Sequence, residues 1–395
     1  MLNRRILRVK AFQSLYAYEQ CKASNLNLAK DYIQEAFAPD LNSMEVQDKK
    51  LLGAQANAAI ELLKKNSTES GKLLHSSENE KVNQTVKDAL SQVAKANQAD
   101  RDFLVKNMVA AAERIPQLYL LAIQLLLAFS DHVKTEFEKK KKLADKNSPV
   151  AFDTELNLTR NQILEKIRIS PSFQAAVARQ NANLDDLELE IKEWFRDYVK
   201  PTEEYQEYLK TTKPTLEQDL AIAEAILKRV IFKNEVILNY FMEKDMNWTE
   251  NKSIVRSLAS KVLKNAAEKD CKDSDLLPEL AINWDEDREF FQNIFNFTLE
   301  EASKSKELIA QKTKNWDIER LAFTDKVIIS MALAEMKHFP SIPVKVSINE
   351  YIDISKTYST PKSKQFVNGL LDVMSKELTE SGEIRKSGRG LLDNK

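Results

Sequence analysis

Apolar residues recur at helical spacing along most of the chain. Near its end, Phe366, Leu370 and Met374 stand four residues apart, and Val367 and Leu371 repeat that step one residue on. This stripe predicts an amphipathic helix. We also expect a first helix over residues 3–20, one or two polar-faced helices within 28–64, and a long helix over about 115–140.

The segment before the last helix is ambiguous by pattern. One helical face collects Val344, Ile348, Ile352 and Ser355. Taken alone, residues 344–348 alternate like a β-strand. Because Pro343 suits a first helical turn, we expect a helix here. The next helix is expected to start at Thr360-Pro361, with Ser363 as an alternative cap.

Composition favours an all-α fold. The chain has 395 residues but only six glycines, and sandwiches or nucleotide-binding sheets need more turn glycines. The most apolar run, 118–129, is too short for a bilayer, which takes about 20 residues. We interpret it as a buried core helix with Pro116 near its first turn. The N-terminus lacks the apolar run of a secretory signal, and two distant cysteines, Cys21 and Cys271, indicate a reducing compartment. We therefore expect a cytoplasmic protein without membrane contact.

Catalytic chemistry is absent from the sequence. No glycine-rich phosphate loop, nucleophile elbow or zinc-type spacing of histidines and cysteines occurs. We therefore expect no enzyme, no metal and no cofactor. The acidic residues within 285–289 stand where a helix is expected to begin, which is typical of dipole complementation rather than of a cation site.

Two local patches could meet nucleic acid, although the net charge is only −1. Arg4 and Arg8 share a helical face, Arg5 lies about a quarter turn away, and Lys10 and Gln13 follow. This is either a phosphate-contacting patch or a solvated N-terminus. The lysine run 139–142 is interpreted as a solvated helix end, with nucleic-acid contact as the alternative.

The second patch lies at the start of the last helix. Lys362, Lys364 and Phe366 surround a helix N-terminus, which combines cations, backbone N–H groups and an aromatic face. Such a set suits single-stranded RNA, where phosphates meet cations and bases stack.

Three blocks of sequence resemble the NusB transcription antitermination family: "RRILRVKAFQSLYAYEQ" at 4–20, "NWDIERLAFTDKVIISMALAEM" at 315–336 and "IPVKVSINEYIDISKTYSTPKSKQFVNGLLD" at 342–372. The last block is the most specific, because its I-N-E and F-V-N-G-x-L-D signatures occur in order. Together the blocks cover about a third of the chain. The resemblance implies two small stacked helical bundles, and we expect residues 3–20 to pack against 283–378.

The resemblance also implies a function. It implies an RNA-binding adaptor, not an enzyme, that binds boxA-type single-stranded RNA of ribosomal RNA leaders. Its implied protein partners are NusE, a ribosomal protein, and elongating RNA polymerase. The implied RNA-binding residues are Arg4, Arg5, Arg8, Gln13, Tyr16, Lys362, Ser363, Lys364 and Phe366, to which the charge pattern adds Lys10. Asp325 takes an acidic position near the implied meeting of RNA and NusE.

This chain departs from the family pattern in two respects. Ile6-Leu7 replaces the third arginine and Val9 an acidic residue, which thins the basic patch, whereas Lys362 replaces a position that is often acidic. Roughly residues 30–280 are also additional. We divide the chain into a first NusB-like helix (1–30), a polar helical insertion or linker (31–114), an additional helical region (115–280), a NusB-like C-terminal bundle (281–380) and a flexible basic tail (381–395).

Four further residues are assigned structural roles. We expect Gly369 to let another backbone approach closely and Asn368 to bond a neighbouring helix end. Asn349 and Glu350 are expected to hold helix ends together. Two alternative functions stay open: a helical protein–protein adaptor without RNA binding, and the NusB-like domain of an RNA-modifying enzyme, which would need a glycine-rich cofactor loop.

Overall fold

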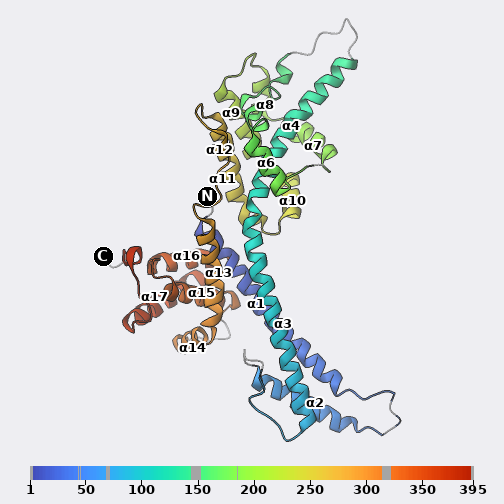
Figure 1. Cartoon of the computed structure of the whole chain (residues 1–395), viewed down its shortest axis with the longest axis vertical. Helices are drawn as coiled ribbons and strands as arrows, with labels where there is room; N and C mark the ends of the chain where they lie inside the picture. The colour runs from blue at the N-terminus through green and yellow to red at the C-terminus, as the bar shows by residue number, and fades with distance from the viewer. Residues whose placement is uncertain are drawn as a thin grey trace. The chain divides into compact units, whose positions relative to one another are not determined.

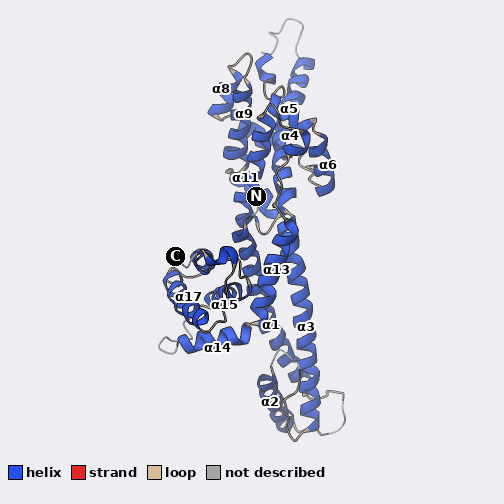
Figure 2. Cartoon of the chain, turned by 60° about the vertical axis from the view of Figure 1, so that its left-hand side comes forward, coloured by secondary structure: helices blue, strands red, loops and turns tan. Residues whose placement is uncertain are grey.

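The computed structural model describes residues 3–42, 44, 46–67, 72–143, 153–184, 186–313 and 322–392. Within these ranges the chain forms helices joined by loops and no strand (Figure 2). The expected all-α fold is confirmed, and residues 344–348 belong to a helix rather than to a strand. Residues 315–321 of the second family-like block lie outside the described residues.

The chain divides into two compact units, whose helices are labelled in Figure 1. Unit 1 comprises Met1–Ile6 and Ala111–Asp287, and unit 2 comprises Leu7–Ala110 and Arg288–Lys395. The limits of the units fall inside α1 (Arg4–Ala36), α3 (Glu80–Glu113) and α13 (Trp284–Glu300). The predicted boundary at residue 30 therefore lies within one helix.

Unit 1 is built around α4. Its helices are α4 (Ile115–Leu143), η1 (Asp153–Leu156), α5 (Gln162–Arg168), α6 (Pro171–Gln180), α7 (Glu188–Trp194), η2 (Phe195–Val199), α8 (Glu203–Leu209), α9 (Leu216–Ala225), η3 (Ile226–Ile231), α10 (Glu235–Lys244), α11 (Trp248–Ala267) and α12 (Asp273–Leu276). Leu118, Leu121 and Leu125 of α4 are buried, and α11 packs along this helix. The interpretation of 118–129 as a core helix is confirmed.

One helical stretch, Glu80–Lys142, includes a window long and apolar enough to cross a membrane by composition alone. Within the protein, 67% of that window is buried. Burial of this kind is what a helix in the core of a folded protein shows.

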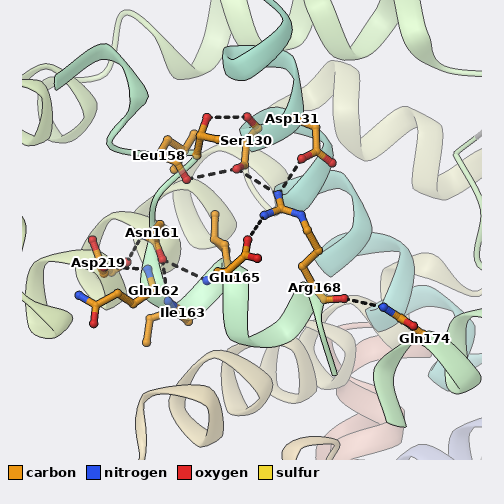
Figure 3. A network of polar contacts seen from close by, with 12 residues as sticks. Ser130, Asp131, Leu158, Asn161, Gln162, Ile163, Glu165, Arg168, Gln174 and Asp219 are labelled. Carbon is orange, nitrogen blue, oxygen red and sulfur yellow. Dashed lines mark hydrogen bonds and ion pairs between the residues drawn. The ribbon is translucent and has the colours of Figure 1, made fainter. Parts of the chain in front are cut away.

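Polar side chains fix the helix junctions of unit 1 (Figure 3). Arg168 donates to Asp131 Oδ1 at 2.7 Å, which ties α5 to α4, and to Glu165 Oε2 at 2.6 Å within α5. Asn161 caps α5 with its Oδ1, and its Nδ2 donates to the carbonyl oxygen of Asp219 at 2.9 Å. Pro171 occupies the first turn of α6, where its missing N–H costs no intrahelical hydrogen bond.

Unit 2 contains a packed cluster largely within residues 31–114, for which the sequence predicts either a polar helical insertion or a linker. Helix α2 (Lys49–Asn66) and the first part of α3 bury Leu62, Leu63, Val86 and Leu90 against Ile33 of α1. The buried apolar residues of α3 recur at helical spacing, so they form one packed face despite the polar composition. The first part of α3 is therefore a helix packed into this cluster.

The other helices of unit 2 pack around α1 from Leu7 onward. They are α13, α14 (Ala302–Lys312), α15 (Phe323–His338), α16 (Val344–Tyr358), α17 (Ser363–Glu380) and η5 (Gly388–Leu391). The Phe12 ring lies 5.3 Å from that of Tyr358, and the Tyr18 ring lies 6.2 Å from that of Phe295. The predicted packing of the first helix against 283–378 is confirmed from Leu7 onward.

The C-terminal residues as far as Leu391 are not a loose tail. Ile384 is buried, and Ser387 N–H donates to the carbonyl oxygen of Pro340 at 3.0 Å. A Cβ atom on Gly390 would overlap that same carbonyl oxygen. This segment therefore docks on the α15–α16 turn, and the close backbone approach expected at Gly369 occurs at Gly390 instead.

Gly369 and Asn368 lie on the exposed side of α17. A Cβ atom on Gly369 would meet nothing within 4 Å, so no backbone packs against it. Asn368 and Asn349 are also exposed, and neither forms a hydrogen bond with any residue the structure describes. The structural roles expected for these three residues are therefore wrong.

Candidate nucleic-acid interface

Arg8 forms the centre of a buried ionic network between α1, α15 and α16. Its Nε and Nη2 donate to the two carboxylate oxygens of Glu335 at 2.7 and 2.8 Å. Ser347 Oγ and Tyr351 OH donate to the same carboxylate at 2.7 and 3.1 Å. Glu350 Oε2 lies 3.6 Å from Arg8 Nη1, which agrees with the structural role expected for Glu350.

Burial and the charge of Glu335 shift the pKa values of Arg8 and Tyr351. Burial alone would lower the pKa of Arg8, but the charge and hydrogen bonds of Glu335 outweigh it and raise that pKa. Burial and the nearby Glu335 charge raise the pKa of Tyr351 well above its usual value. Arg8 thus stays charged and Tyr351 neutral, and a bidentate arginine–carboxylate pair fixes the helices in one geometry.

Three of the predicted RNA-contacting residues are buried, so the prediction is wrong for them. Arg8 is only 3% exposed and Lys10 only 2%, so neither side chain can reach a phosphate on the surface. Ser363 is also buried. The sequence pattern placed these residues outside because it contains no information about what packs over α1 or over the start of α17.

The carboxylate of Asp325 and the hydroxyl groups around Ser363 form a cluster that joins α15 to the turn between α16 and α17. Ser363 Oγ donates to Asp325 Oδ2 at 2.7 Å. Its oxygen also lies 3.0 Å from Ser359 Oγ and 2.8 Å from Thr360 Oγ1. Because Asp325 is buried, it holds this turn in place and presents no carboxylate on the surface for a partner protein.

Aromatic rings extend this cluster to α1. Tyr16 is 37% exposed, and its ring lies 5.3 Å from that of Phe323, which is equally exposed. Phe12 links Tyr16 to Tyr358 through ring distances of 6.3 and 5.3 Å. Thr324 Oγ1, next to Phe323, lies 2.8 Å from Ser359 Oγ. Tyr16 and the turn that begins α17 are therefore parts of one surface.

Sequence reasoning missed Phe323 and Tyr358. Their positions could have indicated them. Phe323 begins α15 and Tyr358 ends α16, each close in sequence to predicted site residues, and an aromatic ring at the end of a helix is often only partly buried.

The start of α17 carries the accessible cations of this surface. Lys362 and Lys364 are exposed, whereas Phe366 and Gln13 are half-buried. Lys362 is the N-cap residue of α17, in place of the expected Thr360 or Ser363, and it provides no side-chain cap. The first turn of α17 contains no acidic residue. An anion could approach these backbone N–H groups without repulsion from an acidic side chain of α17 itself, while the Asp325 carboxylate beside Ser363 lies buried beneath the surface.

Arg4 and Arg5 belong to unit 1. Arg4 Nη2 donates to Glu286 Oε1 at 2.8 Å, and its Nε lies 3.7 Å from Asp287 Oδ1. Burial raises the pKa of Asp287, and Arg4 offsets part of that rise. The acidic start of α13 therefore binds an arginine, while Arg5 is exposed.

Comparison with known proteins covers the C-terminal part of the chain. Residues 251–376 match the NusB family. The transcription antitermination protein NusB of Salinibacter ruber is 40% identical over 105 residues, which is 27% of this chain and 66% of that protein. The protein of the same name from Chloroherpeton thalassium is 40% identical over 118 residues, 30% of this chain and 56% of that protein.

A third NusB protein, from Koribacter versatilis, is 36% identical over 94 residues, 24% of this chain and 64% of that protein. The chain thus spans 56 to 66% of the lengths of these relatives. No solved structure gives a significant match. Because the family match and the similar relatives agree with the all-helical fold, the C-terminal part of this chain is a NusB family domain within a much longer chain.

Proposed function

We propose that the chain is a transcription antitermination factor that binds boxA-type single-stranded RNA. The similar proteins are named transcription antitermination proteins, which supports the general role. The observation that supports RNA contact is the surface at the start of α17, where two exposed lysines adjoin half-exposed rings. Cations there would neutralise phosphates, and Tyr16, Phe323 or Phe366 would stack on bases.

The proposal includes the partners that the family resemblance implies. NusE would bind the NusB domain, and the complex would act on RNA polymerase in the cytoplasm. The relevant region of unit 2 has a fixed geometry, because the Arg8–Glu335 pair and the Asp325–Ser363 bond hold its helices. No catalytic step is part of this role.

A double variant, Lys362→Ala with Lys364→Ala, tests the RNA surface. We expect weaker binding of a boxA oligonucleotide and a salt slope lower by about 1.4, since each phosphate contact to a single strand contributes roughly 0.7. A matched control, Lys306→Ala with Lys376→Ala, removes two exposed lysines from α14 and α17 away from this surface. Equal binding by both double variants would rule out the surface.

A second variant tests stacking. Phe366→Ala should weaken RNA binding by about 1–3 kcal/mol if a base stacks on this ring. Its melting temperature should stay close to that of the wild type, because Phe366 is half-buried rather than part of the core. A lower melting temperature with unchanged RNA affinity would instead assign Phe366 to helix packing.

One observation favours a protein adaptor without RNA binding as the second candidate. Burial removes Arg8 and Lys10 from a basic patch that is already thin. Titration with NusE, in the presence and absence of boxA RNA, separates the two functions. An adaptor would bind NusE with the same affinity in both cases, whereas an RNA-binding factor would bind it more tightly with RNA.

A further inference from the structure

A groove of about 810 Å³ lies along α4 in unit 1, outside the NusB family match. One wall is α4, and the other is formed by α7 and η2, which together make a continuous helix from Glu188 to Val199 (Figure 1). No part of the proposed boxA site belongs to this groove, which therefore needs its own explanation.

Cations follow the second wall in a regular row. Lys192, Arg196 and Lys200 are spaced by four residues, and all three line the groove. The segment Phe195–Val199 is π-helical, a geometry that often occurs at functional sites. Lys139 lines the groove from α4. Beyond it, Lys140 pairs with Glu155 at 3.1 Å, and the exposed Lys141 and Lys142 continue the positive charge.

The acidic side chains of the groove are largely neutralised. Glu136 accepts from Lys200 Nζ at 2.9 and 2.8 Å, and Asp131 is held by Arg168. Arg196 pairs with its neighbour Asp197 on the exposed helix surface. Glu188 also lines the groove. Neither Lys139 nor Lys192 forms an ion pair with a described residue. Each wall therefore offers one lysine that a ligand can engage without first breaking an ion pair, although Glu188 shares the wall of Lys192.

His132 lines the groove, and the charges of three lysines affect its pKa. Burial lowers the pKa of this imidazole, and the charges of Lys200, Lys192 and Lys139 lower it further against the opposing effect of Glu136. Its ring lies 5.5 Å from that of Phe195 at the base of the second wall. Three ammonium groups from the two walls therefore act on one point inside the groove.

We propose that this groove binds the phosphate backbone of a single-stranded nucleic acid through Lys139, Lys192 and Arg196. The row from Lys192 to Lys200 extends over about 12 Å at the helical rise per residue. A single phosphate would engage one end of such a row, whereas a chain of phosphates matches its length. The proposal does not depend on the boxA site, because it assigns a separate contact in the additional region.

A triple variant of the full chain tests this assignment. Lys139→Gln, Lys192→Gln and Arg196→Gln together should weaken binding of a 20-nucleotide uridine RNA about five- to tenfold at low salt. The salt slope should fall by about 2, since three contacts are removed at roughly 0.7 each. The control is Lys213→Gln, Lys233→Gln and Lys261→Gln, three exposed lysines of the same unit that line no described pocket.

Equal affinity and slope for the two triple variants would overturn the proposal, as would the absence of RNA binding to the wild type. The Lys362→Ala, Lys364→Ala double variant, measured in parallel, shows separately whether the boxA surface fails. Acetylation of the unmodified protein provides a second measurement that requires no variant. Bound RNA should protect Lys139 and Lys192 but not Lys213 or Lys261. Equal protection by poly-glutamate would assign the groove to acidic proteins instead and would overturn the RNA assignment.

Discussion

Arg8 and the lysine pair Lys362 and Lys364 are both predicted from sequence as RNA-contacting cations of unit 2, but Arg8 is buried and the two lysines are exposed. Arg8 is enclosed by α15 and α16 and binds the buried carboxylate of Glu335. Lys362 and Lys364 are exposed at the start of α17, where the first turn has no acidic residue. Spacing along one helix does not separate these cases. The position of the partner carboxylate decides whether a cation joins helices or faces a ligand.

The largest expected effect concerns the buried member of this comparison. Arg8→Met should lower the free energy of unfolding by about 3–5 kcal/mol, because it leaves the Glu335 carboxylate buried without its counter-ion. Chemical denaturation measures this change. Lys364→Ala, which removes an exposed cation, should change stability by less than about 0.5 kcal/mol.

Adding Glu335→Gln to Arg8→Met should restore part of the lost stability, since the uncompensated charge is then removed. Similar losses for Arg8→Met and Lys364→Ala would contradict the distinction between the two sets of cations.

Gly390 and Gly369 show the same contrast, because Gly390 is enclosed by backbone and Gly369 faces open space. Gly390→Ala should destabilise the protein by about 1–3 kcal/mol, because the new Cβ overlaps a backbone oxygen that cannot move alone. The docked C-terminal segment should also become more sensitive to proteases. An unchanged melting temperature and digestion pattern would show that this segment is not held on Pro340.

Gly369→Ala should act in the opposite direction. Its Cβ meets open space on α17, and alanine is the better helix former by about 1 kcal/mol. We expect a stability gain of roughly 0.5–1 kcal/mol in chemical denaturation, with RNA affinity unchanged. A loss of stability would instead support the close backbone packing at Gly369 that the sequence predicts.

The smallest expected effect is a pH dependence at an ion pair between α14 and α15. Burial alone would raise the pKa of Glu301, but Lys337, which donates to it at 3.2 Å, lowers that pKa overall. The same contact, together with Glu383, raises the pKa of Lys337. The stabilisation from Glu301 is thus complete above the ordinary carboxyl pKa of about 4.3 and is lost as pH falls through the lower folded value.

Glu301→Gln should therefore reduce the fall in urea midpoint between pH 6 and pH 3.5. Glu307→Gln, at an exposed site on α14, is the control. If both variants keep the acid sensitivity of the wild type, Glu301 is not a source of it.

Local pattern predicted the helices but not what packs against them. The stripe from Phe366 to Met374 and the face that includes Ile348 and Ile352 are determined by neighbours three or four residues away. Helix type and rough limits follow from such spacing. The exposure of Lys362 and Lys364 also followed, because lysines beside a helix N-terminus are a local feature.

Tertiary neighbours account for what was missed. Glu335 is the partner of Arg8 although 327 residues separate them. One signal was present: Glu335 follows the apolar run 327–334, where a lone carboxylate indicates a buried counter-ion. Nothing near Gly390 or Gly369 in sequence indicates which of them meets another backbone, because that depends on where the α15–α16 turn lies.

The discontinuous composition of unit 2 has a consequence for synthesis of the chain on the ribosome. At roughly 5–20 residues per second, about 15 to 65 s separate the emergence of Arg8 from that of Glu335. Residues Ala111–Asp287 emerge in that interval, so the core around α4 can form first. Meanwhile Leu7, Phe12 and Leu15, all buried in the finished fold, wait without their partners. A nascent chain of this kind exposes an apolar face of α1 until translation nears its end, which makes that face a natural substrate for a chaperone.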